Sequence, residues 1–419
     1  MRKNINSIVK YVGTFVLSAG LMLGMTGCGK EKPQEQTTTE AASEEQNSEF
    51  KVRSKDTETK TKEIENIINN YFYFDVDSEK REESYYDGLM KGLDDPYSVY
   101  YTPEEYAKLK EDDSGEYVGI GATVSKNVET GLVYVVKPLR GSPAEASGLQ
   151  VGDVFVEIDG QELTRDMELD EVVKLIRGTE GSVAKLKMYR EGQSDYINFD
   201  VTRAKIQNIT VDYEMLDNQI GYISIEQFIE NTAAQFKEGM DYLAEQGAKG
   251  IVIDLRNNPG GLLSAVIEMA DYVIDDDITA EGAEKAGVLL QTKDKNGKVI
   301  EEYVCKDGHT INLPMVVLVN GNSASASEIF TGCMKDYKIA TIVGKTTYGK
   351  GIVQSVIPLT DGSAIKLTIA KYFTPSGADI HKKGVEPDIE VELSDEHKKM
   401  SVIPHEEDEQ LQKALELFN

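Results

Sequence analysis

Three short segments of the sequence carry residue types that together could support nucleophilic catalysis. In residues 314–330 an apolar run is followed by tiny residues and then by Ser325, Ala326 and Glu328. This order is typical of a strand that enters a helix, where a serine lies beside free amides and the positive end of the helix dipole. These groups can stabilise an alkoxide or an oxyanion. The spacing of Ser325 and Glu328 is also that of a capping box, so Ser325 could simply cap the helix.

The second segment offers a base. Lys350 lies between two glycines and is followed by Ile352 and Val353. A lysine acts as a general base only when it is neutral, so its pKa must fall well below about 10.4. Burial among apolar groups lowers it, because the ammonium loses its water. Gln354 could orient the amine through its side-chain carbonyl oxygen, whereas a carboxylate would keep the amine charged. The alternative for Lys350 is a surface lysine in a glycine-rich turn.

The third segment, residues 254–263, repeats the order of strand, turn and helix and contains Gly260 and Gly261. Two glycines leave the backbone amides open to a ligand. We expect the amide of Gly260 or Gly261, together with that of Ala326, to form an oxyanion hole. An ordinary turn between a strand and a helix is the alternative. A nucleotide site is disfavoured, because neither GxxxxGK[ST] nor GxGxxG follows a strand here.

The elements around these segments fall into successive regions. Residues 56–112 predict a small helical module, in which Thr102 and the following proline begin a helix. Residues 113–204 predict mostly β-structure with one amphipathic helix at about 169–176. Residues 205–395 alternate continuous apolar strands with helices, which indicates parallel strands covered on both faces. Residues 396–419 form a charged tail with a final helix near 409–418.

The N-terminal residues have the pattern of an export signal. Basic residues precede an apolar run from about residue 11 to 25, which ends in Thr26-Gly27-Cys28. This resembles a bacterial lipobox, which implies that residues 1–27 are removed and that Cys28 is lipidated. An uncleaved transmembrane anchor is the alternative, although the run is short for a span of about 20 residues. Residues 28–55 are nearly free of apolar residues and predict a flexible tether. Both readings place the protein outside the cytoplasm, anchored to the cell membrane.

Composition narrows the choice of partners. The 419 residues suggest two or three domains. A net charge of −28 repels phosphate backbones, so nucleic acid is not an expected partner. The chain has two cysteines that could pair, Cys305 and Cys333, but they make no disulfide framework. We expect no metal site and no cofactor, because no histidines stand at metal-ligand spacing beside cysteines or carboxylates. The four histidines are His309, His381, His397 and His405.

The three segments together resemble those of the C-terminal processing (tail-specific) peptidases, a family of serine proteases with a crotonase-like α/β core. The strings DLRNNPGG, SASASE and GKGIVQ appear in the family's order, and flanking matches extend the resemblance from about residue 92 to 392. It implies that Ser325 is the nucleophile, Lys350 the base and Gln354 the residue that orients it. Ser323 and Ser327 would then pack or cap. Asn322 departs from the family pattern, which should alter only the turn.

Residues 141–160 resemble the core of bacterial PDZ domains, and residues 117–121 their carboxylate-binding loop. The loop residues are Tyr117, Val118, Gly119, Ile120 and Gly121. Successive amides there could hold a terminal carboxylate while an extended tail pairs with the neighbouring strand. The helix near 169–176 would line an apolar pocket, or be plain core. Arg177 is a candidate sensor of the peptide carboxylate, or a solvated charge at a helix end.

The sequence therefore predicts an α+β multidomain protein: a crotonase-like α/β protease core with an inserted PDZ-like β domain and an N-terminal helical module. We expect a membrane-anchored serine endopeptidase with a Ser–Lys dyad, which cleaves proteins selected by their free C-termini. Two copies could form a homodimer. A catalytically silent PDZ scaffold is one alternative, disfavoured by the joint presence of the serine, lysine and glutamine. An acyl-CoA enzyme on the same core is another, disfavoured by export and by the peptide-binding module.

Overall fold

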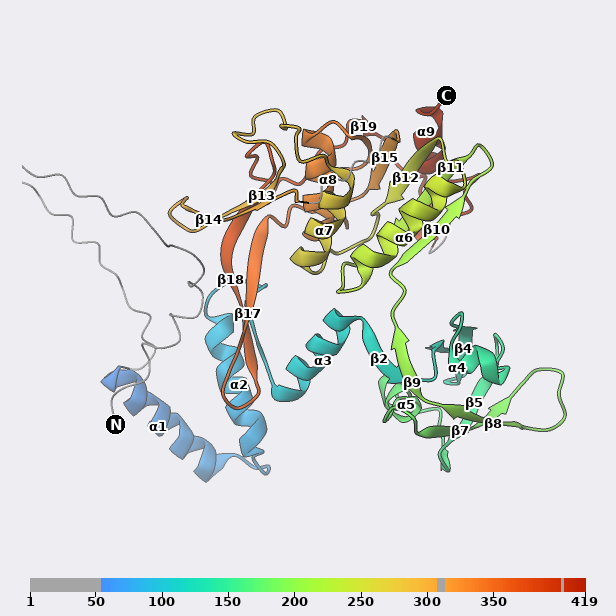
Figure 1. Ribbon diagram of the computed structural model, residues 1–419. Coiled ribbons are helices and arrows are strands. Elements are labelled where there is room, and N and C mark those ends of the chain that lie inside the picture. The colour runs from blue at the N-terminus through green and yellow to red at the C-terminus, as the bar shows by residue number, and fades with distance from the viewer. Residues whose placement is uncertain (1–53, 307–312, 401–402) are drawn as a thin grey trace, which may run out of the picture. The chain divides into compact units, whose positions relative to one another are not determined.

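The computed structural model describes residues 54–306, 313–400 and 403–419 (Figure 1). The expected signal peptide, the lipidation site Cys28, almost all of the tether and His309 lie outside these residues. The chain divides into two compact units, residues 1–75 and residues 76–419. Among the helices of the described residues, none combines the length and apolar character needed to cross a membrane.

The described part of the first unit is dominated by one helix, α1 (Lys55–Tyr71). Ser54 caps it, accepting a hydrogen bond from the amide of Thr57 at 3.2 Å. No side chain of α1 is buried, and the apolar residues Ile64, Ile67 and Tyr71 are all exposed. The helix therefore carries exposed apolar side chains.

The second unit begins with a helical module and an inserted β domain. Thr102 and Pro103 begin α3 as predicted, with a complete capping box to Glu105. The β domain is a sheet in the order β3-β4-β5-β7-β8, with β6 beside β5. Its core contains the buried Phe155, Leu186 and Met188. The elements are α2 (Ser78–Lys91), β1 (Val99–Tyr101), α3 (Pro103–Ser114), β2 (Glu116–Gly119), β3 (Ala122–Lys126), β4 (Val133–Pro138), α4 (Pro143–Ser147), β5 (Val154–Ile158), β6 (Gln161–Glu162), α5 (Leu169–Ile176), β7 (Val183–Tyr189), β8 (Ile197–Thr202) and β9 (Ala204–Gln207).

The remaining elements build the larger α/β core. They are β10 (Val211–Met215), β11 (Ile220–Ile225), α6 (Thr232–Glu245), β12 (Gly250–Asp254), α7 (Leu263–Val273), β13 (Val288–Lys293), β14 (Val299–Val304), β15 (Met315–Val319), α8 (Ala326–Asp336), β16 (Ala340–Gly344), β17 (Ile352–Pro358), β18 (Ala364–Phe373), β19 (Ile389–Glu390), the 3₁₀ turn His397–Lys399 and α9 (Glu409–Glu416). The main sheet has the order β10-β11-β12-β15-β16-β19 and is parallel from β11 onward.

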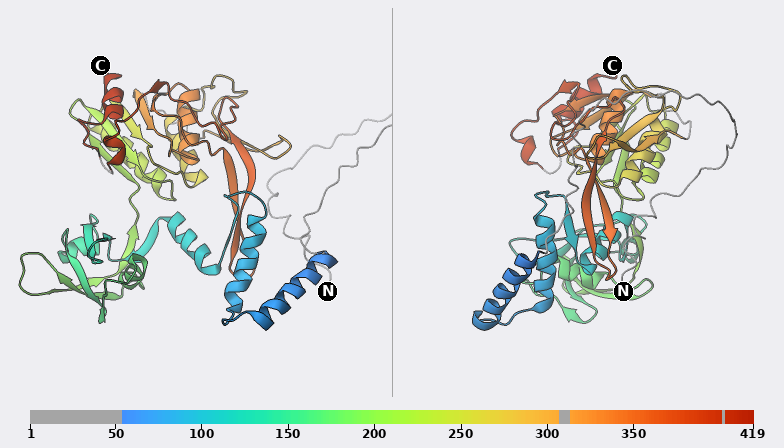
Figure 2. Two further views of the ribbon diagram at one scale, coloured as in Figure 1. Left: turned by 180° about the vertical axis from the view of Figure 1, so that it is seen from behind. Right: turned by 90° about the vertical axis from the view of Figure 1, so that its left-hand side faces the viewer.

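Alternate residues of each strand in this sheet face different helices, because side chains point to opposite faces in turn. Ile251 and Ile253 pack in the cluster formed with α6, α7 and α8, whereas Val252 packs with Leu411 and Ala414 of α9. Figures 1 and 2 show these helices on the two faces of the sheet. Every residue of β12 and of β15 is buried. The predicted parallel, doubly covered sheet is confirmed.

A second sheet crosses the boundary between the helical module and the core. Its order is β1-β18-β13-β14, and β17 also pairs with β18. The short strand β1 lies antiparallel to β18, with Val99 opposite Lys366 and Tyr101 opposite Ala364. This pairing brings residues just before β1 to the start of β17, where Lys350 lies.

The segment expected as a charged tail packs on the core. Arg256, two residues beyond β12, donates to Asp408 at 2.7 Å and to Gln410 at 3.0 Å. The same guanidinium donates to Asp254 at 2.6 Å. All four side chains of this network are largely buried. Desolvation opposes burial of the charges, so loss of one partner would leave a costly unpaired charge in the core.

Candidate active site

Ser325 stands in a strained turn between β15 and α8. Its φ is +54° and its ψ −113°, a conformation that residues with a side chain rarely adopt. Strain of this kind persists only where surrounding contacts hold it, and it is concentrated at functional sites. The two flanking serines are fully buried and engaged: Ser323 donates to the carbonyl of Leu255 at 2.8 Å and Ser327 to that of Asn258 at 3.0 Å. Of the three serines, Ser325 is the one that is partly exposed.

Glu328 ties the serine turn to the lysine turn. Its carboxylate is fully buried and accepts from the amide of Ser325 at 2.9 Å and from the amide of Lys350 at 2.8 Å. It also accepts from the amide of Gly349 at 2.7 Å and from the hydroxyl of Thr347 at 2.6 Å. A buried carboxylate is tolerated when hydrogen bonds replace its water. The main-chain amides of the two candidate catalytic residues therefore donate to the same carboxylate.

The capping-box interpretation of Ser325 is met only in part. The carboxylate of Glu328 accepts from the Ser325 amide, as the box requires, but the hydroxyl of Ser325 makes no N-cap hydrogen bond. The amide of Glu328 donates instead to the main-chain carbonyl of Ser325 at 2.8 Å. The cap thus does not account for the serine hydroxyl.

Tyr372 makes a second bridge between the same two turns. Its hydroxyl lies 2.5 Å from the carbonyl oxygen of Lys350 and 3.1 Å from that of Ser325. Burial, and to a lesser degree the charge of Glu328, raise the pKa of this phenol well above its usual value. Tyr372 therefore stays a neutral donor beside the carbonyls of both residues.

Lys350 has the environment that a neutral amine needs. Burial lowers the pKa of Lys350, and the charge of Lys366 lowers it further, against the opposing effect of Asp95 and Glu328. The Nζ atom lies 4.7 Å from the centroid of the Tyr97 ring. Within the described residues no hydrogen bond joins this amine to the hydroxyl of Ser325 or to Gln354.

Gln354 lies on β17 and is engaged through its amide nitrogen. Its Nε2 donates to the hydroxyl of Thr368 on the paired strand β18, at 3.5 Å. This contact orients the side chain so that the nitrogen faces Thr368 and the carbonyl oxygen faces away. The oxygen is the atom that could accept a hydrogen bond from Lys350.

The glycine turn lies directly beside the serine. A β-carbon added to Gly260 would come within 2.7 Å of the Ser325 β-carbon and 2.9 Å of the Ala326 amide nitrogen. The amide of Gly260 is already used, since it donates to Asn258 at 2.9 Å. In the described part of the chain the amides of Gly261 and Ala326 donate no hydrogen bond. Gly261, whose φ is +145°, therefore fits the role of second donor better than Gly260.

The residues predicted as a carboxylate-binding loop border a cavity of about 770 Å³, but the first three of them, 117–119, lie in strand β2, which pairs antiparallel with β9. All of residues 117–121 except Val118 line it, as do Val173 and Ile176 of α5. Arg177, which ends this helix, also lines the cavity, stacks 4.7 Å from the Tyr117 ring centroid and pairs with Glu111. It is therefore not simply a solvated charge.

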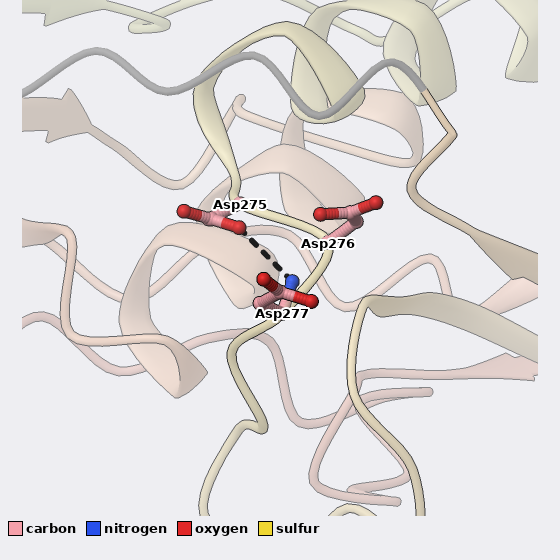
Figure 3. Close-up of side chains that lie close together, drawn as sticks. All are labelled: Asp275, Asp276 and Asp277. Atoms are coloured by element: carbon pink, nitrogen blue, oxygen red, sulfur yellow. Dashed lines mark hydrogen bonds between the residues drawn. The ribbon is translucent and has the colours of Figure 1, made fainter.

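Three consecutive aspartates form the candidate metal cluster found among the described residues. Asp275, Asp276 and Asp277 follow α7 and bring carboxylate oxygens within 4.8 Å of one another. Asp275 accepts a hydrogen bond from the amide of Asp277 at 3.0 Å (Figure 3). Two of the three are exposed, and no second observation within the described residues points to a bound cation. The cluster thus gives no ground for assigning a metal.

Sequence reasoning missed four residues that hold the site together: Tyr97, Glu328, Tyr372 and Asp408. Glu328 stands at capping distance from Ser325, and its place in the SASASE string is the signal that marks it. Tyr97 lies in the run GLDDPYS, at the start of the part of the chain that resembles the family. Nothing in the sequence marks Tyr372 or Asp408, because each acts through contacts with residues far away in the chain.

Three parts of the chain match known protein families. Residues 219–391 match Peptidase family S41, residues 134–190 match the PDZ domain, and residues 15–105 match the Activating protease CtpB N-terminal domain. The last match includes much of the predicted signal and tether.

The chain is also similar to whole proteins. It is 40% identical over 354 residues to the "Probable CtpA-like serine protease" of Staphylococcus haemolyticus, which covers 84% of this chain and 68% of that protein. It is 37% identical over 328 residues to the "Carboxy-terminal processing protease CtpA" of Bacillus subtilis, which covers 78% of this chain and 67% of that one. Among solved structures, the photosystem II D1 C-terminal processing protease aligns with 30% identity and a TM-score of 0.45, over 79% of this chain and 86% of that one.

Proposed function

Because this chain belongs to peptidase family S41, we propose that it cleaves peptide bonds through an acyl-enzyme on Ser325, with Lys350 as the general base. The chain is a serine-type C-terminal processing protease with a PDZ domain. The observation that best supports this dyad is the shared carboxylate of Glu328, which holds the main chains of both residues. The strained turn at Ser325 points to the same residue.

In the proposed reaction the neutral amine of Lys350 takes the hydroxyl proton of Ser325 as Oγ attacks the scissile carbonyl carbon. The amides of Gly261 and Ala326 would donate to the resulting oxyanion. The ammonium of Lys350 then gives its proton to the leaving amine as the C–N bond breaks. A water molecule, deprotonated by the same amine, attacks the ester. The ester C–O bond then breaks, the acid product leaves, and Oγ takes the proton back from the ammonium. Gln354 would hold the amine toward the serine through its carbonyl oxygen.

A fluorophosphonate probe tests this function directly, because it reacts only with an activated serine. We expect stoichiometric labelling of the purified protein, with the probe mapped to Ser325 by peptide mass spectrometry. The same preparation should cleave peptides with free C-termini. A protein that binds such peptides yet neither cleaves them nor reacts with the probe would instead be a silent PDZ scaffold.

We further propose that the PDZ domain selects substrates by their C-terminal tails. Supporting this, the segment Tyr117–Gly121 and Arg177 border one cavity. The lining of that cavity also includes Pro259, which lies next to the proposed oxyanion turn. An arriving carboxylate would compete with Glu111 for the guanidinium of Arg177. Remote binding energy of this kind can help to assemble catalytic groups.

The Arg177→Glu protein is expected to have a several-fold lower kcat on peptides with a free C-terminal carboxylate. The reason is that the reversed charge repels the carboxylate whose binding favours the active arrangement. Lys174→Glu is the matched control, since Lys174 lies on the same helix but does not line the cavity. Steady-state kinetics on paired free and amidated peptides provide the measurement. A change in KM with an unchanged kcat would mean that the PDZ domain only binds the substrate and does not contribute to turnover.

Membrane anchoring through a lipid on Cys28 is also a proposal, supported by the lipobox-like sequence. We expect Cys28→Ala to move the protein from the membrane to the soluble fraction without reducing its catalytic activity, because the tether separates the anchor from the core. Fractionation of cells followed by a peptidase assay on both fractions measures this. Retention of the variant in the membrane would favour a transmembrane anchor.

The homodimer stays a prediction. The exposed apolar residues Ile64, Ile67 and Tyr71 of α1 are the surface that a second copy could cover. Sedimentation of the soluble protein would report twice the monomer mass if it does, and the monomer mass if it does not.

A further inference from the structure

The amine of the proposed base rests on an aromatic ring. The Nζ atom of Lys350 lies 4.7 Å from the centroid of the Tyr97 ring. A cation within about 6 Å of a ring centroid is attracted by the electron-rich face of the ring. A neutral amine carries no charge for that face to attract. The contact therefore favours the protonated form of Lys350, the form that cannot act as a base.

The ring is held in place by a segment that is remote from the lysine in sequence. Asp95 accepts from the amide of Tyr97 at 3.1 Å and from the hydroxyl of Ser98 at 2.6 Å. Ser98 in turn accepts from the amide of Thr368 on β18 at 3.1 Å, and Thr368 accepts from Gln354. This chain of hydrogen bonds fixes the ring against the strands that carry the site.

The edge of the ring is fixed as well. The hydroxyl of Tyr97 donates to that of Tyr348 at 3.3 Å. That hydrogen bond, together with burial, raises the pKa of Tyr97 to about 12, so the phenol is neutral wherever Lys350 titrates. The charged groups whose fields reach the amine are Lys366 on β18, Asp95 before β1 and Glu328 on α8.

We propose that Tyr97 is a positioning residue that holds the protonated side chain of Lys350 on its ring and releases it toward Ser325 when the amine loses its proton. This inference rests on the proposed Ser–Lys dyad. The ring couples the charge of the base to its position: a charged amine stays on the ring, and a neutral one can turn to the serine hydroxyl. Tyr97 thereby shifts the start of activity to higher pH.

The test is the pH dependence of kcat/KM, which reports the ionisation of the uncombined enzyme. In Tyr97→Leu we expect the acidic limb to move to lower pH by about half a unit, the size expected from an exposed cation–ring contact. Tyr97→Phe keeps the ring, so its acidic limb should lie at the same pH as that of the unchanged protein. The rate of fluorophosphonate labelling at each pH gives the same profile without peptide binding.

Tyr106→Leu is the matched control. Tyr106 is also a tyrosine of the helical module, but its ring lies 4.4 Å from the amine of Lys110 and not over Lys350. It should leave the limb in place. If Tyr97→Leu does not fold, Tyr97→Met removes the same ring with a more adaptable side chain and carries the same expectation.

An acidic limb that does not shift in Tyr97→Leu would overturn the proposal. An equal shift in Tyr97→Phe would also overturn it, because the effect would then belong to the hydroxyl. These results differ from failure of the dyad. If Lys350→Ala retained activity, the base itself would be misassigned, whereas an inactive Lys350→Ala with an unshifted Tyr97→Leu would remove only the role of the ring.

Discussion

Replacement of Ser325 by alanine is expected to abolish peptide hydrolysis, with a loss of about 10⁴-fold or more, the size found when a nucleophile is removed from a serine protease. Ser325 is the partly exposed serine at the strained start of α8, beside the unused amides of Gly261 and Ala326. Since the proposed acyl-enzyme forms on this hydroxyl, the loss should appear in kcat. Turnover of a peptide with a free C-terminus measures it.

Ser323→Ala and Ser327→Ala are the matched controls, because they remove a hydroxyl from the same turn. Each hydroxyl donates to a buried carbonyl, so each variant should lose about 1 kcal/mol of unfolding free energy while keeping reduced activity. Chemical denaturation of the three variants separates loss of stability from loss of the nucleophile. Full activity in Ser325→Ala, or a dead Ser327→Ala with normal stability, would contradict the assignment.

Lys350→Ala is expected to be inactive, and Lys350→Arg as well, because a guanidinium keeps its proton throughout the working range. Burial lowers the pKa of Lys350. In the proposed dyad the neutral form of this amine is the active one. Activity of the unchanged protein should therefore be low at acidic pH and rise as pH passes the lowered pKa, earlier than for an ordinary lysine. The pH profile of kcat/KM measures this rise.

His381→Ala is the matched control for the base. The side chain of His381 is partly buried, and its Nδ1 has no hydrogen-bond partner among the described residues. Burial, with the charges of Lys371 and Lys382, lowers its pKa. A neutral imidazole would be a competent base, so this variant is a demanding test. We expect it to retain substantial activity; an active Lys350→Ala with a dead His381→Ala would restore a histidine base.

The sequence predicted those parts of the fold that depend on local pattern. The continuous apolar runs that become β12 and β15 identified buried parallel strands, and Thr102-Pro103 marked the start of α3. Short-range motifs also led to the protease family and to the PDZ domain, both of which the comparisons support. These features could be predicted because each follows from residues within a few positions of one another.

The rest depends on contacts that local pattern does not encode. The pairing of β1 with β18 joins residues about 270 positions apart, as in the hydrogen bond between Thr368 and Ser98. That pairing places Tyr97 over Lys350, and no hydrophobic periodicity in the sequence predicts it. Glu328 looked like a capping residue because its distance from Ser325 is local, whereas its bonds to residues 347–350 are not. The resting position of the lysine likewise follows from tertiary packing alone.

The network of Arg256 has a consequence for the order in which the enzyme is made. Arg256 opens the turn that carries Gly260 and Gly261, but its partner Asp408 lies 152 positions later in the chain. A polypeptide that leaves the ribosome with its N-terminal part first presents the glycine turn long before α9 can dock. The turn gains its full set of buried partners only when that late segment arrives. Biosynthesis thus delays the completion of this turn until the last helix is made, so an incomplete chain would be a poor protease toward its neighbours.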